Sequence, residues 1–403
     1  MRRSFVFILF VSLIFNLFTP SYGQQPKICS ENGCLLSVKH IGDYSKSELE
    51  TYLEKGVKIE NAYSIYTIRY LSSGQEVLAT VAIPFQISPP KGGWHIVANN
   101  HGTTGIADVC ALTGTVMGSG LAGLFGARGF IGIAPDYPGL GTSGIHPYLI
   151  SESEGSSSLD ALRAARNLAL KLQIPISNRF AMVGMSQGGH ATLAAAQKHK
   201  AYAPELDIRA FAVVAPAIVW EEHWKEATKF NGLHLAYHAL FVYAWSHYYG
   251  FKGPSPWNKE IIPKIDEWME TSCALPPKPN IPWLGHFFSE KAEEIFSPAF
   301  LAEYRTAQWR QFSFMRTGFL QNRIGPYLQT APLRIYQGKQ DFVVPEYQTT
   351  ALVENLKKGG IKLDYILLPS GSHTDIAFGF VAQKQIKTDE SIQWIREQLD
   401  KTK

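Results

Sequence analysis

The sequence predicts an α/β fold in which helices flank a mainly parallel sheet and a helical cap is inserted between two parts of that sheet. Between residues 94 and 215, short apolar runs typical of buried strands alternate with helical segments, as in a parallel sheet. Between about residues 216 and 329 the alternation stops, and this stretch holds seven of the nine tryptophans. Alternation resumes from Leu333 to Leu399. The expected parts are a core of residues 24–215 and 331–403 and a helical cap, or lid, of residues 216–330.

The first residues are typical of a secretory signal peptide. Arg2 and Arg3 precede an apolar run of 14 residues, Phe5–Phe18, which is followed by small residues up to Gly23. The run is shorter than the roughly 20 residues that span a bilayer. We therefore expect cleavage of residues 1–23 near Gly23 and export to the periplasm or the extracellular space.

Charge and composition exclude some classes of partner. The formal net charge is +4, and removal of Arg2 and Arg3 with the leader lowers it to +2. The sequence contains no basic cluster interleaved with aromatic residues, so we expect no nucleic-acid partner. We also expect no cofactor and no metal, and a monomer.

The four cysteines predict two disulfides in an exported protein, and four cysteines allow three pairings. Cys29 and Cys34 flank a short Glu-Asn-Gly turn, which suits a local bridge. A bridge between Cys110 and Cys273 would then tie the core to the cap. The C-x₄-C spacing has no second ligand pair nearby, so we expect no zinc site.

The first elements of the core are expected to be a short helix and a hairpin. Ser45 and Glu48 have the spacing of a capping box, which predicts a helix from there to about Lys55. Ala62–Leu71 alternates apolar and polar residues, and Val77–Ile83 follows after a Ser-Ser-Gly turn. These runs predict an antiparallel hairpin at the edge of the sheet.

The other core elements are expected from apolar runs and helical periodicity. Ser158 is expected to cap a long helix that places Leu159 and Leu162 on one face. The other expected strands are Trp94–Ala98, Phe130–Ala134, Phe180–Val183, Ala210–Val214, Leu333–Tyr336 and Leu363–Leu368, and the other helices begin at His190 and span Val344–Lys358 and Glu390–Leu399.

Residues 184–188, Gly-Met-Ser-Gln-Gly, form a G-x-S-x-G motif between a predicted strand and a predicted helix. A serine in so sharp a turn is strained and exposed, and Gly184 and Gly188 lack the Cβ atoms that would clash with neighbouring chain. The turn places the Gln187 N–H and the helix N-terminus where negative charge on an attacked carbonyl collects. We therefore predict that Ser186 is a nucleophile.

A serine nucleophile needs a base, and the base needs an orienting acid. Asp341 follows the strand expected at 333–336, and His373 follows the next strand, at 363–368. Both lie at the carboxyl ends of parallel strands, the edge from which Ser186 also emerges. The order Ser, acid, His predicts a catalytic triad of these residues. The alternatives are a helix N-cap for Asp341 and, for His373, a position in a surface loop or at the start of a helix.

Other polar residues have simpler explanations. Asp136 precedes the serine and lies in a Pro/Gly loop, which favours a role in the turn. His190 lies one helical turn beyond Ser186, where its side chain leaves the nucleophile. His234 and His238 share a helix face but lack the Glu of H-E-x-x-H, so we expect cap surface rather than a metal pair.

His101-Gly102-Thr103-Thr104 follows a predicted strand in the place of an oxyanion loop. Gly102 lets the chain turn its next N–H inward, so Thr103 or Thr104 is expected to be the second donor beside Gln187. Thr103 is the preferred donor. His101 is expected to belong to the loop architecture rather than to act as a base.

Four stretches together resemble the secretory lipase family of α/β hydrolases, in its bacterial branch. They are HGTTGIADVC from His101, PDYPGLGTSGIHPY from Pro135, GMSQGGH from Gly184 and GKQDFVVP from Gly338. The resemblance extends from about Tyr70 to Leu399 and is weakest in the cap. It implies an α/β-hydrolase fold, a triad of Ser186, Asp341 and His373, a cap that covers an acyl pocket, and hydrolysis of carboxylic esters, including acylglycerols. It implies no acyl-chain length, because the cap is the most variable part of this family.

The leading hypothesis is a secreted serine carboxylester hydrolase, a lipase or an esterase, that acts through an acyl-enzyme on a small-molecule or lipid ester. An exported serine peptidase or acyltransferase is the alternative within the same chemistry, because the triad is shared. A catalytically inactive binding protein is the alternative of another class, and the complete set of triad residues disfavours it.

The run from Leu233 to Tyr249 is too apolar to face water on all sides, although it lies in an insertion outside the sheet. One interpretation is a mobile lid over the serine cleft that contacts acyl chains or, transiently, a lipid surface when open. The other is a helix packed permanently in the core of the insertion. The two interpretations predict different effects of substitutions at Phe241 and Trp245, because a lid would use these side chains to bind long acyl chains.

Overall fold

The computed structural model describes residues 29–52, 58–224, 232–289, 291–373 and 388–401. The predicted signal peptide, residues 1–23, lies outside these ranges. Within them, no helix combines the length and the hydropathy that crossing a membrane requires.

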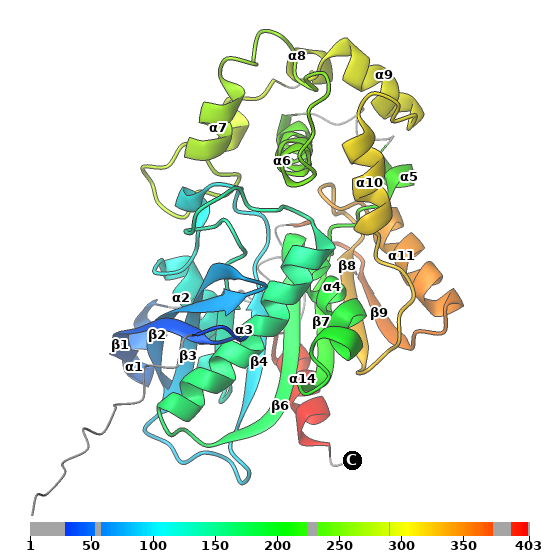
Figure 1. Ribbon diagram of the computed structural model, residues 1–403. Coiled ribbons are helices and arrows are strands. Elements are labelled where there is room, and N and C mark those ends of the chain that lie inside the picture. Colours follow the sequence, from blue (N-terminus) through cyan, green and yellow to red (C-terminus); the bar gives the residue numbers. More distant parts are fainter. Residues whose placement is uncertain (1–28, 53–57, 225–231, 290, 374–387, 402–403) are drawn as a thin grey trace, which may run out of the picture.

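The described residues form one sheet of nine strands in the order β1-β2-β3-β5-β4-β6-β7-β8-β9 (Figure 1). The strands are β1 (Leu35–Tyr44), β2 (Ala62–Ser72), β3 (Gln75–Phe85), β4 (Trp94–Asn100), β5 (Ile131–Pro135), β6 (Ile176–Met185), β7 (Asp207–Val214), β8 (Leu333–Gly338) and β9 (Leu363–Leu368). The pairs from β1 to β3 and the pair β3–β5 are antiparallel, and every pair from β5 to β9 is parallel. The mainly parallel sheet is therefore confirmed.

Helices cover both faces of the sheet, and this explains the continuous apolar run Phe180–Val183 in strand β6. Phe180 and Met182 pack in one core cluster with residues of α3 (Ser151–Lys171), α4 (Gln187–Tyr202) and α11 (Glu346–Lys358). Ala181 and Val183 point to the other face and pack with residues of α2 (Val116–Gly126) and α14 (Thr388–Asp400). Because successive side chains of a strand point to opposite faces, a strand covered on both sides needs a continuous apolar run.

The inserted cap lies beyond the carboxyl ends of the parallel strands, at the top of Figure 1. Its elements are α5 (Glu221–Trp224), α6 (Gly232–Tyr248), α7 (Ile265–Thr271), η3 (Leu284–His286), α8 (Ala292–Ile295), α9 (Pro298–Thr306) and α10 (Ser313–Gln321). The cap has an aromatic core of its own. In this core the rings of Phe241 and Trp245 lie 4.0 Å apart, and that of Phe319 lies 5.4 Å from Trp245. Phe241 and Trp245 are fully buried there, as a permanently packed cap helix requires.

Replacement of Trp245 by serine should therefore lower stability rather than change substrate choice. Removal of a buried Trp or Phe side chain costs about 3–5 kcal/mol of unfolding free energy. We expect Trp245→Ser and Phe241→Ser to lower the midpoint of urea unfolding, with an unchanged ratio of activities on long-chain and short-chain esters. A selective loss of activity on long-chain emulsions, with unchanged stability, would contradict this expectation and favour the mobile lid.

Near the amino end of the chain, the predicted capping box is confirmed, and the predicted position of the hairpin at the sheet edge is wrong. The capping box is confirmed: the Ser45 N–H donates to Glu48 Oε2 (2.7 Å) and the Glu48 N–H to Ser45 Oγ (3.3 Å), and α1 spans Lys46–Tyr52. Its predicted end near Lys55 lies outside the described residues. The hairpin β2–β3 is not at the edge, because β1 pairs with β2. Strand β1 was missed since it is largely exposed and has no apolar periodicity.

The prediction that Ser158 caps the long helix is wrong. Helix α3 begins at Ser151, and Ser158 is buried in its interior. The first two turns of α3 bury polar side chains, including Glu154, so they lack the apolar periodicity that would have revealed the true start.

Both predicted disulfides are present. Cys29 is bonded to Cys34, and Cys110 to Cys273. Cys110 lies in η1 (Asp108–Cys110), in the chain that follows β4, and Cys273 follows α7 of the cap. The second bridge therefore joins the cap to the core close to the loop that was predicted to bind an oxyanion.

Candidate active site

Ser186 lies in a sharp turn between β6 and α4 and has the strained backbone that the motif predicts. Its φ of 54° and ψ of −117° are unusual for a residue with a side chain. A Cβ on Gly184 would lie 2.0 Å from the Gly188 carbonyl oxygen, and one on Gly188 would lie 1.9 Å from that of Asn100. Only glycine fits at both positions, so the motif is explained by the close approach of three chain segments.

Asp341 and His373 are hydrogen-bonded to each other at the same edge of the sheet. His373 Nδ1 lies 2.7 Å from Asp341 Oδ2, and both residues are buried. The other carboxylate oxygen, Oδ1, accepts the N–H groups of Val343 (2.9 Å) and Val344 (2.8 Å). Because an ionised carboxylate only accepts hydrogen bonds, the proton of the neutral imidazole is on Nδ1, and Nε2 remains free to accept one.

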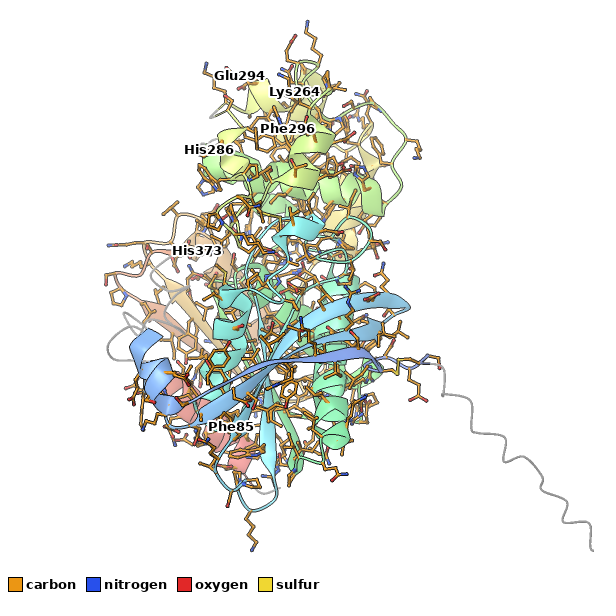
Figure 2. All side chains as sticks on the ribbon, turned by 90° about the vertical axis from the view of Figure 1, so that its left-hand side faces the viewer. Phe85, Lys264, His286, Glu294, Phe296 and His373 are labelled. Carbon is orange, nitrogen blue, oxygen red and sulfur yellow. A yellow bond between two sulfur atoms is a disulfide. The ribbon has the colours of Figure 1, made fainter. Side chains whose placement is uncertain are left out.

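The topology explains how these three residues come together from distant parts of the sequence. Ser186 follows β6, Asp341 follows β8 and His373 follows β9, and β6, β7, β8 and β9 are neighbours in the parallel sheet. All three therefore leave the sheet at its carboxyl edge. Figure 2 shows His373 at the level where the cap meets the body, below Phe296 and His286 of the cap.

Beside Ser186 is a small cavity of about 70 Å³ between the cap and the core. Its lining comes from the serine turn, helix α6 and the segments after β4, β5, β7 and β8. These residues are Thr103, Tyr148, Leu149, Ser186, Ala217, Ile218, His223, His234, Tyr237, His238, Val343, Val344, Pro345 and Gln348.

The expectation that His234 and His238 lie on the cap surface is wrong, because both are buried and line this cavity. His238 Nδ1 lies 3.0 Å from the Tyr304 hydroxyl, and His234 Nε2 lies 2.5 Å from the Phe342 carbonyl oxygen. The amino-terminal half of α6 faces the serine, which the sequence could not reveal because α6 is apolar on all sides. Within the described part of the chain, no group of three or more His, Cys, Asp or Glu side chains could hold a metal ion.

Burial keeps these imidazoles neutral. It lowers the pKa of His238 to about 3, with the nearby His234 as a second cause, and it also lowers the pKa values of His234 and His223. At neutral pH the cavity wall therefore contributes hydrogen-bonding groups without added positive charge.

The depressed pKa of His238 predicts a loss of stability in acid. The unfolded chain binds a proton on this side chain below about pH 6.5, whereas the folded protein resists it until about pH 3. The contribution to stability is therefore present above pH 6.5 and is lost as the pH falls toward 3. We expect His238→Phe to reduce the fall in unfolding free energy between pH 6.5 and 4, measured by urea unfolding. An unchanged pH dependence would contradict this assignment.

The loop expected to supply an oxyanion donor passes beside the nucleophile, because a Cβ on Gly102 would lie 3.6 Å from that of Ser186. Thr103 lines the cavity, whereas the Thr104 side chain is buried and its carbonyl accepts the Leu275 N–H (3.1 Å) of the cap. These positions are consistent with the preference for Thr103.

The Gln187 N–H lies at the start of α4. The Ser186 carbonyl accepts its helical hydrogen bond from the His190 N–H (3.1 Å), so the N–H groups of the intervening residues have no acceptor within the helix. These free N–H groups and the positive end of the helix suit a developing oxyanion.

The other polar residues near the motifs have structural roles. Asp136 accepts the N–H groups of Leu112 (2.7 Å) and Thr113 (3.0 Å), so its carboxylate holds the segment after η1 rather than its own Pro/Gly turn. His101 is buried, with Nδ1 at 2.7 Å from the Gly102 carbonyl. His190 points away from the serine, and its Nδ1 lies 2.6 Å from Glu154 Oε2. Glu154 was not singled out from the sequence, because it precedes Ser158, the predicted start of the helix.

Comparison with known proteins agrees with this architecture. Residues 107–232 match the family model Secretory lipase. No curated protein matches the chain. One similar solved structure is the rice cell wall degrading esterase LipA from Xanthomonas oryzae, with a TM-score of 0.77 and 19% identity over 92% of this chain and 99% of that one. A second is a putative hydrolase from Legionella pneumophila, with a TM-score of 0.75 and 22% identity over 92% of this chain and 99% of that one. A third is Candida antarctica lipase A in its closed state, with a TM-score of 0.66 and 15% identity over 92% of this chain and 84% of that one. At these identities the similarity shows a shared fold and no more. The chain therefore has the α/β-hydrolase fold, and its residues 107–232 match the secretory lipase family.

Proposed function

We propose that this chain is an exported carboxylester hydrolase, a lipase or an esterase, that works through a serine acyl-enzyme. The observation that carries the proposal is the hydrogen-bonded pair of His373 and Asp341 at the sheet edge where Ser186 occupies its strained turn. The match to the secretory lipase family and the similarity to esterase and lipase structures support an ester as substrate. Export is supported by the leader sequence and by the two disulfides.

In this mechanism Ser186 Oγ attacks the ester carbonyl carbon and gives its proton to His373 Nε2. Asp341 stabilises the imidazolium through Nδ1, and the N–H groups of Gln187 and Thr103 bind the negative oxygen of the tetrahedral intermediate. The intermediate collapses to the acyl-enzyme, and the alcohol leaves with the proton from His373. Water then attacks the acyl group, His373 accepts its proton and returns one to Ser186, and the acid is released.

The volume of the cavity limits the size of the acyl group that can bind in it. A cavity of about 70 Å³ is far smaller than the roughly 300–1,000 Å³ of pockets that enclose drug-sized ligands. In this conformation it holds only a short acyl chain, so a longer chain requires the cap to move as a whole, with α6 still packed in the aromatic core of the cap. A transient contact of the moved cap with a lipid surface, and a monomeric state, are further parts of the proposal.

A series of nitrophenyl esters from acetate to palmitate, incubated with the purified mature chain, tests the activity directly. The expected result is hydrolysis, with the highest kcat/KM for short acyl groups. Nitroanilide peptides and an added acceptor alcohol in the same assay test the peptidase and acyltransferase alternatives. Absence of hydrolysis across the whole ester series, with a folded protein, would refute the proposal.

A further inference from the structure

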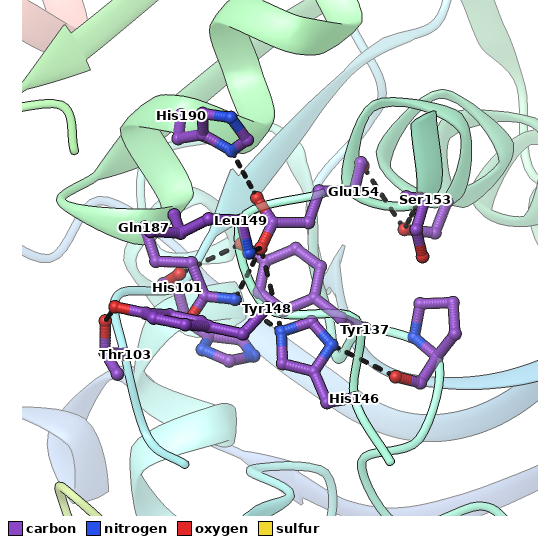
Figure 3. A network of polar contacts seen from close by, with 12 residues as sticks. His101, Thr103, Tyr137, His146, Tyr148, Leu149, Ser153, Glu154, Gln187 and His190 are labelled. Atoms are coloured by element: carbon purple, nitrogen blue, oxygen red, sulfur yellow. Dashed lines mark hydrogen bonds and ion pairs between the residues drawn. The ribbon is translucent and has the colours of Figure 1, made fainter. Parts of the chain in front are cut away.

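We propose that Glu154, buried in the first turn of α3, is a positioning residue that holds both oxyanion donors in place behind Ser186. The proposal rests on the function proposed above. Figure 3 shows its carboxylate between Gln187, His190 and Leu149, with Tyr148 and Thr103 beside them.

The Glu154 carboxylate is fully buried and has three hydrogen-bond partners. Oε1 accepts from the Leu149 N–H (2.9 Å) and from the Gln187 side-chain amide (2.8 Å), and Oε2 lies 2.6 Å from His190 Nδ1. The first two partners can only donate, so Oε1 is an acceptor. Burial of a carboxylate is costly unless it is well bonded, so its environment is built around it.

On one side, Glu154 determines the orientation of Gln187, whose backbone N–H is the proposed donor. One N–H of the side-chain amide goes to Glu154, and Nε2 lies 2.6 Å from His146 Nε2. Burial lowers the pKa of His146 to about 4, so its ring is neutral, and its Nδ1 is 3.1 Å from the Pro138 carbonyl. The neutral ring therefore donates from Nδ1 and accepts at Nε2, which uses the second amide N–H. The reversed amide would place its oxygen against the Glu154 carboxylate.

The same carboxylate contacts two side chains in the first turn of α4. Gln187 is the first residue of the helix and His190 lies three residues later, and both side chains are bonded to Glu154. Helix α3 is thereby tied to the start of α4, the segment that carries the strained Ser186. Strained backbone persists only where the surrounding structure enforces it.

On the other side, Glu154 is linked to the oxyanion loop. Leu149, whose N–H it accepts, has a φ of 56°, which is unusual for a residue with a side chain. The preceding residue, Tyr148, places its hydroxyl 2.8 Å from Thr103 Oγ1. Thr103 is the second proposed donor, so both donors are connected to Glu154 through one intervening group each: the Gln187 amide and the Leu149–Tyr148 segment.

The position of these donors determines how well they bind the oxyanion. Loss of a single oxyanion donor lowers kcat by about 10²–10³-fold, and a displacement of about 1 Å near the reacting atoms costs up to about 10²-fold. Loss of the Glu154 contacts should therefore lower kcat without a change in the ground-state contacts that determine KM.

A purely structural role is the competing interpretation, and Asp160 provides the control. Asp160 is also a fully buried carboxylate of α3, bonded to Ser72 Oγ (2.6 Å), Tyr202 Oη (2.8 Å) and Arg163 (2.6 Å), at a distance of two helical turns from Glu154. Asp160→Leu removes an equally buried charge without a contact to the serine turn.

The experiment compares Glu154→Met, Glu154→Gln and Asp160→Leu on a soluble nitrophenyl ester, well below each unfolding midpoint. Glu154→Met should lower kcat about 10–100-fold with an unchanged KM. It should also raise, by the same factor, the inhibition constant of an alkylboronic acid, because the tetrahedral adduct of this inhibitor occupies the oxyanion site. Glu154→Gln keeps an oxygen toward Leu149 and Gln187 and should retain most of the activity. Asp160→Leu should lose stability but keep its kcat.

Gln187→Met is a second variant that keeps the buried charge and its bonds to Leu149 and His190, should Glu154→Met fail to fold. It should also lower kcat and weaken boronate binding. Wild-type kcat and boronate affinity in Glu154→Met or in Gln187→Met, or an equal kcat loss in Asp160→Leu, would overturn the positioning role. Failure of the proposed function is distinguishable, because it would leave the wild-type protein inactive on the ester or the Ser186→Ala variant fully active.

Discussion

Ser186→Ala and His373→Ala should each lower kcat for ester hydrolysis about 10³-fold or more, because a nucleophile and its base act as one unit. Alanine at position 186 removes the attacking oxygen, and alanine at 373 removes the group that accepts its proton. The substitutions leave the sheet unchanged, since both residues lie beyond the carboxyl ends of its strands. Because the nucleophile and the base act as one unit, the double variant should be no less active than either single variant.

Initial rates on nitrophenyl butyrate, with unfolding midpoints of all variants, measure this effect. Ser158→Ala is the matched control, because Ser158 is a buried serine of α3 that does not line the cavity, and it should keep the wild-type kcat. Near-normal turnover in Ser186→Ala would refute the serine mechanism, and losses that multiply in the double variant would show that the two residues do not act together.

Asp341→Asn should also lower kcat strongly, although by less than Ser186→Ala or His373→Ala and although the substitution changes the size of the side chain very little. Oδ1 of Asp341 accepts the N–H groups of Val343 and Val344, so the oxygen of an asparagine would take that position. Its NH₂ group would then face His373 Nδ1 and donate to it. The imidazole proton would move to Nε2, the atom that must accept the proton of Ser186.

The same assay tests this prediction, with Asp364→Asn as the control. Asp364 lies on β9 and pairs with Arg334 near the surface (2.8 Å), where an ion pair contributes little, so its loss should leave kcat and stability nearly unchanged. A wild-type kcat in Asp341→Asn would mean that this carboxylate does not orient the base.

Much of the fold could be predicted because the informative patterns are local. A strand covered on both faces needs a continuous apolar run, and a serine in a sharp strand-to-helix turn needs glycine two residues before and after it. Such patterns located strands β4 to β9, the turn at Ser186 and the loops that carry Asp341 and His373. They also indicated where the alternation stops and the cap begins.

Elements without such a local pattern were missed or misplaced. Strand β1 is largely exposed and has no periodicity, so nothing in its sequence distinguishes it from a loop. The start of α3 is polar because it packs beneath the serine turn. Without an apolar pattern there, the helix was predicted to start at Ser158 rather than at Ser151. The face of α6 that points toward Ser186 could not be predicted from the sequence, since a helix that is apolar on all sides has no preferred buried face.

The sequence by itself determined the α/β order of elements, the serine turn and the residues that follow each strand of the parallel sheet. It did so because backbone conformation and burial impose their requirements within a few neighbouring residues. Only the tertiary structure decided which polar groups meet: that His373 bonds to Asp341, that His234 and His238 line the cavity beside Ser186, and that Glu154 binds Gln187 and Leu149. Such contacts depend on how distant segments pack, and a side chain's residue type does not specify its partner.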